Sequence, residues 1–205
     1  MVNEQGFDKV APVAFHTKGP LSTPEGASRW GNYYNESGIP VTHFDGRWRS
    51  SGGSTQTYNN YLNLFNTRKV VPSALTVTFL KNGYGDGHVS VKVRVRLEED
   101  LAGANVCHVA LWETNVIESS ETHRYVERAL ASEDVTVTKA NQTQEFSHVF
   151  DLKSEWKTAD MGVTAFVQCN TWPNEKLVQN GAAAKLVEAI TVAPASLGRV
   201  KALYR

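Results

Sequence analysis

The two cysteines are the side chains whose chemistry depends most on spacing. Cys107 and Cys169 lie far apart, so neither belongs to a Cys-x-x-Cys redox motif, and two thiols cannot form a four-cysteine zinc site. Each lies in an alternating, strand-like run. If these runs pair antiparallel with Leu111 opposite Ala165, the two cysteines face each other and could form a cross-strand disulfide. The alternative is two small, half-buried thiols that pack in the core.

His16, His43 and Asp45 are candidates for a metal or acid/base site, because they come from the ends of two predicted strands. Their spacing is not specific for any one kind of site, and a histidine at a strand end is more often a half-exposed polar cap than a ligand. No nucleophile elbow, zinc-protease helix or phosphate loop is present. We therefore predict no catalytic residue, no metal site and no cofactor.

Aromatic residues cluster between residues 30 and 58. Trp30, Tyr34 and Trp48 are candidates for an exposed surface that binds a sugar or a peptide, since aromatic rings offer large contact areas. The alternative is that these rings pack against the neighbouring helices.

Composition excludes some partners. The chain has 205 residues, of which 41% are hydrophobic, enough for one large or two small domains. Its 21 basic and 21 acidic residues balance, and no basic run suggests a nucleic-acid partner. No apolar window approaches the roughly 20 residues of a transmembrane helix. The N-terminus also lacks the cationic start and apolar core of a signal peptide.

The first part of the chain mixes helix and strand signals. Thr23 and Pro24 mark the start of a helix, as N-cap and first helical residue, and Pro72 ends a later helix. We therefore predict a boundary between domains at residues 1–71 and 72–205. The predicted elements of the first domain are a strand in "KVAPVAFH", a helix in "STPEGASRWGNYY", strands in "GIPVTHFDG" and "RWRSSGG", and a helix in "STQTYNNYLNLFNTRKVV".

After Pro72 the hydrophobic period becomes two. In "GHVSVKVRVRLEED" valines alternate with polar and charged residues, which is typical of a strand with one face in the core and one in water. Similar runs recur to about residue 170, separated by Gly, Asn and Asp. They favour a two-layer antiparallel sandwich followed by a C-terminal arm.

The first domain resembles the second half of a thioredoxin-like domain, with Gly38, Ile39 and Pro40 in the position of the cis-proline loop. Together with "HVALWE" and "THRYVERAL", the chain resembles bacterial proteins related to outer-membrane lipoproteins, in which such a domain precedes a β-sandwich. The resemblance covers nearly the whole chain. It implies an α+β fold, an incomplete thioredoxin-like half followed by an immunoglobulin-like sandwich. The family's first strand and helix, with its Cys-x-x-Cys pair, have no counterpart here.

We therefore expect a non-catalytic binding or assembly module of the bacterial cell envelope or extracellular space. Its location would be periplasmic, outer-membrane-associated or extracellular, and its partner a protein or another copy of the chain. One alternative is the C-terminal fragment of a thioredoxin-like thiol-disulfide oxidoreductase whose cysteines lie upstream. A second alternative is a carbohydrate-binding sandwich.

The missing central strand would leave a gap between "APVAFH" and "PVTHFDG". Two rows of unpaired backbone groups are too unfavourable to persist, since each buried one costs about 1 to 3 kcal/mol. We predict that the two strands pair directly or that a strand from elsewhere fills the gap. The preferred donor is "KLVEAITVAP", which between copies would build a dimer or a filament.

Overall fold

The computed structural model describes residues 6–7 and 9–188 as a mostly β protein with two α-helices. In the first part of the chain the elements are α2 (Pro24–Ser28), the π-helix η1 (Arg29–Tyr33), β1 (Val41–Phe44), β2 (Trp48–Ser51) and α3 (Thr55–Arg68). The remaining elements are β3 (Leu75–Gly85), β4 (His88–Leu97), β5 (Asn105–Glu113), β6 (Val116–Glu118), β7 (Glu121–His123), β8 (Val126–Val135), β9 (Thr143–Asp151), η2 (Thr158–Asp160), β10 (Met161–Cys169), β11 (Val178–Lys185) and β12 (Val187–Glu188).

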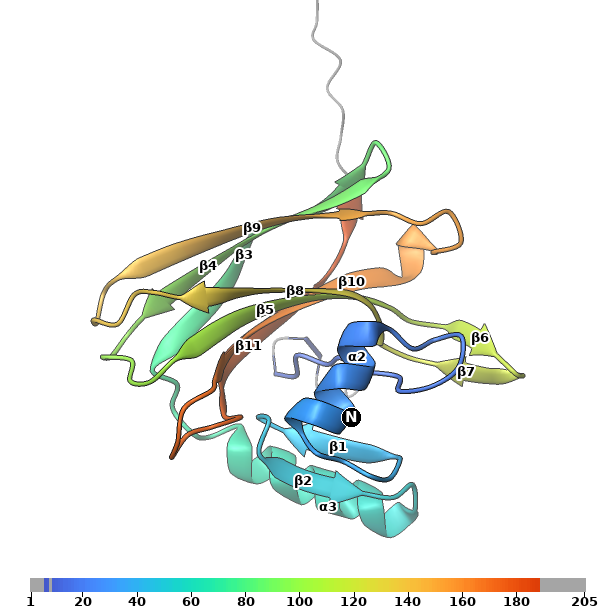
Figure 1. The fold of residues 1–205 in the computed structure, drawn as a ribbon, viewed down its shortest axis with the longest axis horizontal. Helices are drawn as coiled ribbons and strands as arrows, with labels where there is room; N and C mark the ends of the chain where they lie inside the picture. The colour runs from blue at the N-terminus through green and yellow to red at the C-terminus, as the bar shows by residue number, and fades with distance from the viewer. Residues whose placement is uncertain (1–5, 8, 189–205) are drawn as a thin grey trace, which may run out of the picture.

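Two four-stranded sheets form a sandwich. Their strand orders are β11-β10-β5-β8 and β12-β3-β4-β9, and Figure 1 shows them as two layers. The pairs within them are antiparallel except for β12, which runs parallel to β3 and makes the second sheet mixed. The core lies between the layers. In β4 the valines and the final leucine are buried while Arg94 and Arg96 are exposed, which confirms the alternation predicted from the sequence.

β5 and β10 are buried along almost their whole length, because their sheet is covered on both faces. One face meets the other sheet. On the outer face lie α2 and the N-terminal segment, by which we mean the described residues 6–7 and 9–23. β1, β2 and α3 lie beyond them (Figure 1). This explains why side chains on both faces of these strands are buried, although the sequence of each was interpreted as an alternating run.

The segment predicted as the first strand does not pair with β1. Instead Ala14 forms a parallel bridge with Val126 at the edge of β8. The amide of Ala14 donates to the carbonyl of Tyr125 at 2.7 Å, and its carbonyl accepts from the amide of Glu127 at 2.9 Å. Of the two predicted alternatives, direct pairing of the two strands is therefore wrong. The open edge of β8 offered the segment backbone partners together with an apolar sheet face to cover.

The C-terminal donor strand is only partly visible. Its first residues end β11 and form β12, which pairs with β3 and not with β1. Residues 189–194 of the predicted donor, and the rest of the C-terminal arm to residue 205, lie outside the described residues. The expected α+β class is met only in part, because strands dominate the described chain.

The helix–hairpin unit, residues 24–68, follows its local sequence signals. The Thr23 hydroxyl accepts a hydrogen bond from the amide of Gly26 at 3.0 Å, as an N-cap does. Ser54 and Thr57 form a capping box at the start of α3. Between the two helices, the peptide bond from Ile39 to Pro40 is cis.

The register between β5 and β10 differs from the predicted one. Leu111 stands opposite Val163 rather than Ala165, a difference of two positions. Cys107 therefore does not face Cys169, and both thiols are free and buried.

A glycine explains this register. Gly162 stands directly opposite Trp112, and a Cβ atom on Gly162 would lie 2.2 Å from the indole ring. Only a residue without a side chain fits beneath this ring. The indole nitrogen donates to the Thr164 hydroxyl at 3.0 Å, which holds the ring across the neighbouring strand.

Candidate functional site

Arg29 attaches the helix–hairpin unit to the sandwich. Its side chain is buried, and its guanidinium donates to the neutral amide of Gln168 at 2.6 Å. The rings around it are Phe15, Tyr33, Tyr34 and Phe166, with centroids 5.0 to 5.5 Å from the guanidinium carbon. Cation–π attraction offsets part of the unfavourable desolvation of a buried charge. The side chain therefore serves to hold the two parts together.

His108 and Ser132 form the pair that most resembles a catalytic base and nucleophile. The Nδ1 atom of His108 lies 2.7 Å from the hydroxyl of Ser132, in a cleft beside α2 and η1. Burial, with a smaller contribution from the charge of Arg29, lowers the pKa of His108 to about 3. A general base works best with a pKa near the working pH. At neutral pH this imidazole is therefore neutral, and a pKa this low makes it a weak base toward the serine hydroxyl.

The three predicted metal-site candidates do not converge on one another. The ring of His16 packs against that of His123, with centroids 5.0 Å apart. His43 stacks on Tyr34, at 4.2 Å, and Asp45 accepts a hydrogen bond from the Nε atom of Arg68 at 2.8 Å. Among residues 6–7 and 9–188, no group of three or more His, Cys, Asp or Glu side chains could hold a metal ion.

The predicted aromatic surface is half-buried in this structure. Trp30 and Tyr34 lie on η1 and at its end, and the ring of Trp48 is covered by the guanidinium of Arg68 at 3.7 Å. Tyr34 stacks on His43 and Trp48 lies under Arg68, both within the helix–hairpin unit, and the binding of a sugar or a peptide by the three rings stays a prediction. Gly38, Ile39 and Pro40 are exposed before β1, with Ile39 71% exposed.

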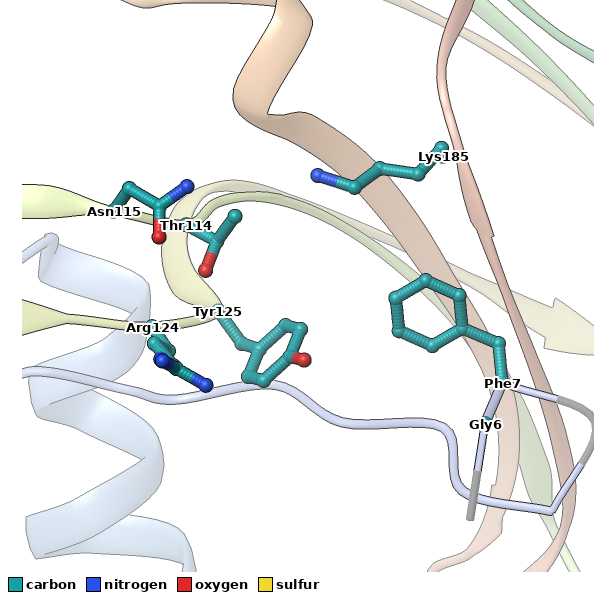
Figure 2. Close-up of a pocket in the computed structure, with 7 residues that line it drawn as sticks. All are labelled: Gly6, Phe7, Thr114, Asn115, Arg124, Tyr125 and Lys185. Carbon is teal, nitrogen blue, oxygen red and sulfur yellow. The ribbon is translucent and has the colours of Figure 1, made fainter. Parts of the chain in front are cut away.

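A separate pocket combines rings with charged groups (Figure 2). It has a volume of about 460 Å³ and lies beside the β6–β7 hairpin. We call it the Lys185 pocket. The described residues that line it are Gly6, Phe7, Thr114, Asn115, Arg124, Tyr125 and Lys185. They come from the N-terminal segment, the turns on both sides of the hairpin and the last residue of β11.

The apolar part of the Lys185 pocket consists of the rings of Phe7 and Tyr125, which pack on Trp112. The centroid of Phe7 lies 5.6 Å from that of Trp112 and 6.2 Å from that of Tyr125, and the last two rings are 5.2 Å apart. Trp112 is fully buried and supports the other two. Tyr125 has a φ of 57°, in the left-handed region, which costs a non-glycine residue roughly 1 to 2 kcal/mol. Its carbonyl is held by the amide of Ala14, so the docked N-terminal segment maintains this conformation.

Asp160 organises the polar side of the pocket. Its carbonyl accepts from the amide of Thr114 at 3.0 Å and from the ammonium of Lys185 at 3.2 Å. Its carboxylate accepts from the side-chain amide of Asn115 at 2.9 Å. The Lys185 ammonium also lies 5.2 Å above the ring of Trp112, and Figure 2 shows it extending across the pocket toward Thr114. The arrangement presents a fixed cation above an apolar surface.

The sequence did not indicate this pocket. Trp112 and Tyr125 lie in the runs "HVALWE" and "THRYVERAL", which were interpreted as sandwich strands only. An aromatic residue next to a polar turn, as in "WETN" and "RYV", was the available signal. Such a signal is too common to single out a site without the residues that complete it.

Comparison with solved structures shows a shared fold at low sequence identity. HBP35 of Porphyromonas gingivalis matches 71% of this chain with a TM-score of 0.53 and 13% identity. The match covers 52% of HBP35, so this chain spans about half the length of that protein. At this identity the likeness shows the fold alone.

Two further structures are less similar. A domain of the outer membrane lipoprotein Omp28 from Porphyromonas gingivalis matches 58% of this chain and 93% of its own length, with a TM-score of 0.40 and 15% identity. Spo0M, a sporulation control protein from Bacillus subtilis, matches 58% of this chain and 50% of its own, with a TM-score of 0.34 and 12% identity. No protein-family model and no curated protein sequence matches the chain. None of the helices in the described residues is long and apolar enough to cross a membrane.

Proposed function

We propose that this chain is a non-catalytic binding or assembly module of the bacterial cell envelope or extracellular space, and that the Lys185 pocket captures its partner. The composition of the pocket carries this proposal. Its volume of about 460 Å³ lies within the range of roughly 300 to 1,000 Å³ that is usual for ligand sites. Like such sites, it joins aromatic surface with a few well-placed polar and charged groups.

The finer description of the fold belongs to the same proposal. The order of a helix, a strand after a cis-proline, a hairpin arm and a second helix supports a partial thioredoxin-like domain, with its boundary at Pro72. The two packed sheets that follow support an immunoglobulin-like sandwich. Placement in the envelope or extracellular space rests on the sequence resemblance described above.

A ligand screen by nuclear magnetic resonance tests the proposal. Cocktails of small acids, sugars and short peptides should shift the amide signals of Phe7, Thr114 and Tyr125. The substitution Thr114→Trp should fill the pocket and abolish these shifts, whereas Thr122→Trp, on the exposed strand β7, should leave them unchanged. Ligands whose effects survive Thr114→Trp, or a complete lack of binders at millimolar concentration, would contradict the proposal.

The sugars in the screen distinguish the alternative function, a carbohydrate-binding sandwich, from the main proposal. The cleft beside α2 and η1 is also about 460 Å³ in volume and presents the polar groups of Tyr33, His108, Ser132 and Asn170. The charged side chains of Glu25 and Arg29 also line this cleft, and together with the hydroxyl, amide and imidazole groups they offer the hydrogen bonds that a sugar needs. Sugar-induced shifts confined to this cleft would favour a carbohydrate-binding sandwich over the main proposal.

Self-association by strand donation is the assembly part of the proposal. Within residues 6–7 and 9–188, β1 pairs only with β2, so its other edge has no strand beside it. An open edge is a template for a strand from another chain. Size-exclusion chromatography with light scattering should show a dimer or a larger species at micromolar concentration, and a strictly monomeric protein would exclude donation between copies. Deleting residues 189–205 tests whether the C-terminal arm is the donor.

A further inference from the structure

We infer that the Lys185 pocket takes a carboxylate group attached to an apolar or aromatic group. This inference rests on the proposed function, in which the pocket binds a ligand, and it names the chemistry of that ligand. Three features of the described residues carry it: the charge of the pocket wall, the way the Lys185 ammonium is held, and the ring cluster beneath.

The charged side chains of the wall are cations. Among the described residues that line the pocket, Arg124 and Lys185 are positively charged and none is an aspartate or a glutamate. Figure 2 shows them on different sides of the pocket, with Arg124 beside Tyr125 and Lys185 on β11. An anion in the pocket would therefore interact favourably with both.

Lys185 is oriented without being neutralised by a direct ion pair. Its ammonium donates to the carbonyl of Asp160, at 3.2 Å, and the carboxylate of Asp160 is instead bonded to Asn115. An ammonium group has three N–H donors, so two remain for a ligand. A side chain that is already ordered by one hydrogen bond and by the Trp112 ring loses less conformational entropy when it binds.

The net charge favours a monoanion. Arg124 and Lys185 contribute two positive charges, and the nearby carboxylate of Asp160 contributes one negative charge. The sum of these described groups is one positive charge, which matches a carboxylate better than a doubly charged phosphate. Burial raises the pKa of the Tyr125 phenol, so its ring stays neutral and does not oppose an anion.

The rings select the rest of the ligand. Phe7 and Tyr125 meet nearly edge to face, at an interplanar angle of 82°, over the buried Trp112. Such a surface favours contact with an aliphatic or aromatic group over contact with a second charge. The same chemistry occurs in a free small acid and in the C-terminal residue of a polypeptide.

Isothermal titration calorimetry of the full chain can compare two ligands that differ only in charge. N-acetyl-phenylalanine should bind at least about tenfold more tightly than N-acetyl-phenylalaninamide, a difference of about 1.4 kcal/mol. Lys185→Gln and Arg124→Gln should each remove most of this preference by weakening the binding of the acid more than that of the amide. Raising the salt concentration from about 10 to 150 mM should weaken only the acid.

Lys153→Gln is the matched control. The Lys153 ammonium also stands over a tryptophan, 5.4 Å from the ring of Trp156, but this lysine does not line the pocket. Its substitution should leave both affinities unchanged. Circular dichroism melts of each variant show whether it is folded, and Arg124 and Lys185 are both exposed, so neither substitution leaves a cavity in the core.

The outcomes distinguish the inference from the proposed function. Equal binding of acid and amide, both lost in Thr114→Trp, would overturn the carboxylate inference and leave the pocket as a binding site. No binding of either compound, with other ligands in the pocket, would also overturn it, whereas an empty screen would overturn both. A short peptide ending in phenylalanine that binds more tightly than N-acetyl-phenylalanine would support a polypeptide C-terminus as the source of the carboxylate.

Discussion

Gly46, in the turn between β1 and β2, packs the helix–hairpin unit closely against the connection between β10 and β11. It is buried with a φ of 72°, and a Cβ atom there would lie 1.9 Å from the carbonyl oxygen of Lys176. The side-chain amide of Gln168 donates to that same carbonyl at 2.6 Å. Gly46→Ala therefore tests whether the two parts are packed as closely as the structure shows.

The expected loss has two sources. Ordinary van der Waals contact begins at 3.4 Å, so the Lys176 carbonyl must withdraw by about 1.5 Å and break its bond to the buried Gln168. Leaving a buried polar group unsatisfied costs about 1 to 3 kcal/mol. The left-handed backbone costs alanine roughly 1 to 2 kcal/mol more than glycine. We expect Gly46→Ala to lower the free energy of unfolding by about 2 to 5 kcal/mol.

Gly87→Ala separates the two sources. Gly87 has almost the same φ, 76°, but nothing lies within 4 Å of its Cβ position, so only the backbone cost of roughly 1 to 2 kcal/mol applies. Urea unfolding, followed by circular dichroism and tryptophan fluorescence, measures both variants. The reasoning fails if Gly46→Ala loses no more stability than Gly87→Ala, because the contact with Lys176 would then contribute nothing.

Three further predictions concern buried titratable groups. Burial lowers the pKa of His108 from 6.5 to about 3, so the free energy of unfolding should fall as the pH falls below 6.5. The expected slope is up to about 1.4 kcal/mol per pH unit. His108→Gln should remove this slope when urea unfolding is measured at pH 7, 5 and 4. Burial raises the pKa of Glu127, so its contribution to the free energy of unfolding should weaken as the pH rises above 4.5. If Glu127→Gln shows the same dependence of stability on pH as the unsubstituted chain, this reasoning is wrong. Burial raises the pKa of Cys107 to about 12, and Cys107 and Cys169 are 0% and 1% exposed, so both thiols should react with a thiol reagent only as fast as the protein unfolds. Mass spectrometry measures this reaction, and rapid labelling of either cysteine in the folded protein would refute the prediction.

Local patterns in the sequence predicted those elements that are determined by interactions between residues close together in the sequence. The alternation in β4 was sufficient because one of its faces packs in the core and the other meets solvent. Thr23 and Pro24 located the start of α2, because an N-cap satisfies amides within its own turn. These signals depend on neighbours a few residues away.

The strand register and the cysteine geometry were not predictable in this way. A shift of two positions between β5 and β10 returns every side chain to the same face, so alternation cannot distinguish the two registers. The contact of Trp112 with Gly162 distinguishes them, and it exists only once the two strands are paired. The predicted opposition of Cys107 and Cys169 followed the wrong register.

The sequence by itself predicted β5 and β8, which flank the Lys185 pocket, because an alternating strand pattern is local, but it predicted neither the β6–β7 hairpin nor β11. The tertiary structure alone decided that Phe7, Trp112 and Lys185 meet. Their meeting requires the N-terminal segment to dock on the edge of β8 rather than beside β1, and β11 to end beside the β6–β7 hairpin. Both depend on which sheet edge and which apolar face remain uncovered after the sandwich forms. Segments that are far apart in the sequence compete for these surfaces, so a pattern of a few neighbouring residues cannot predict the outcome.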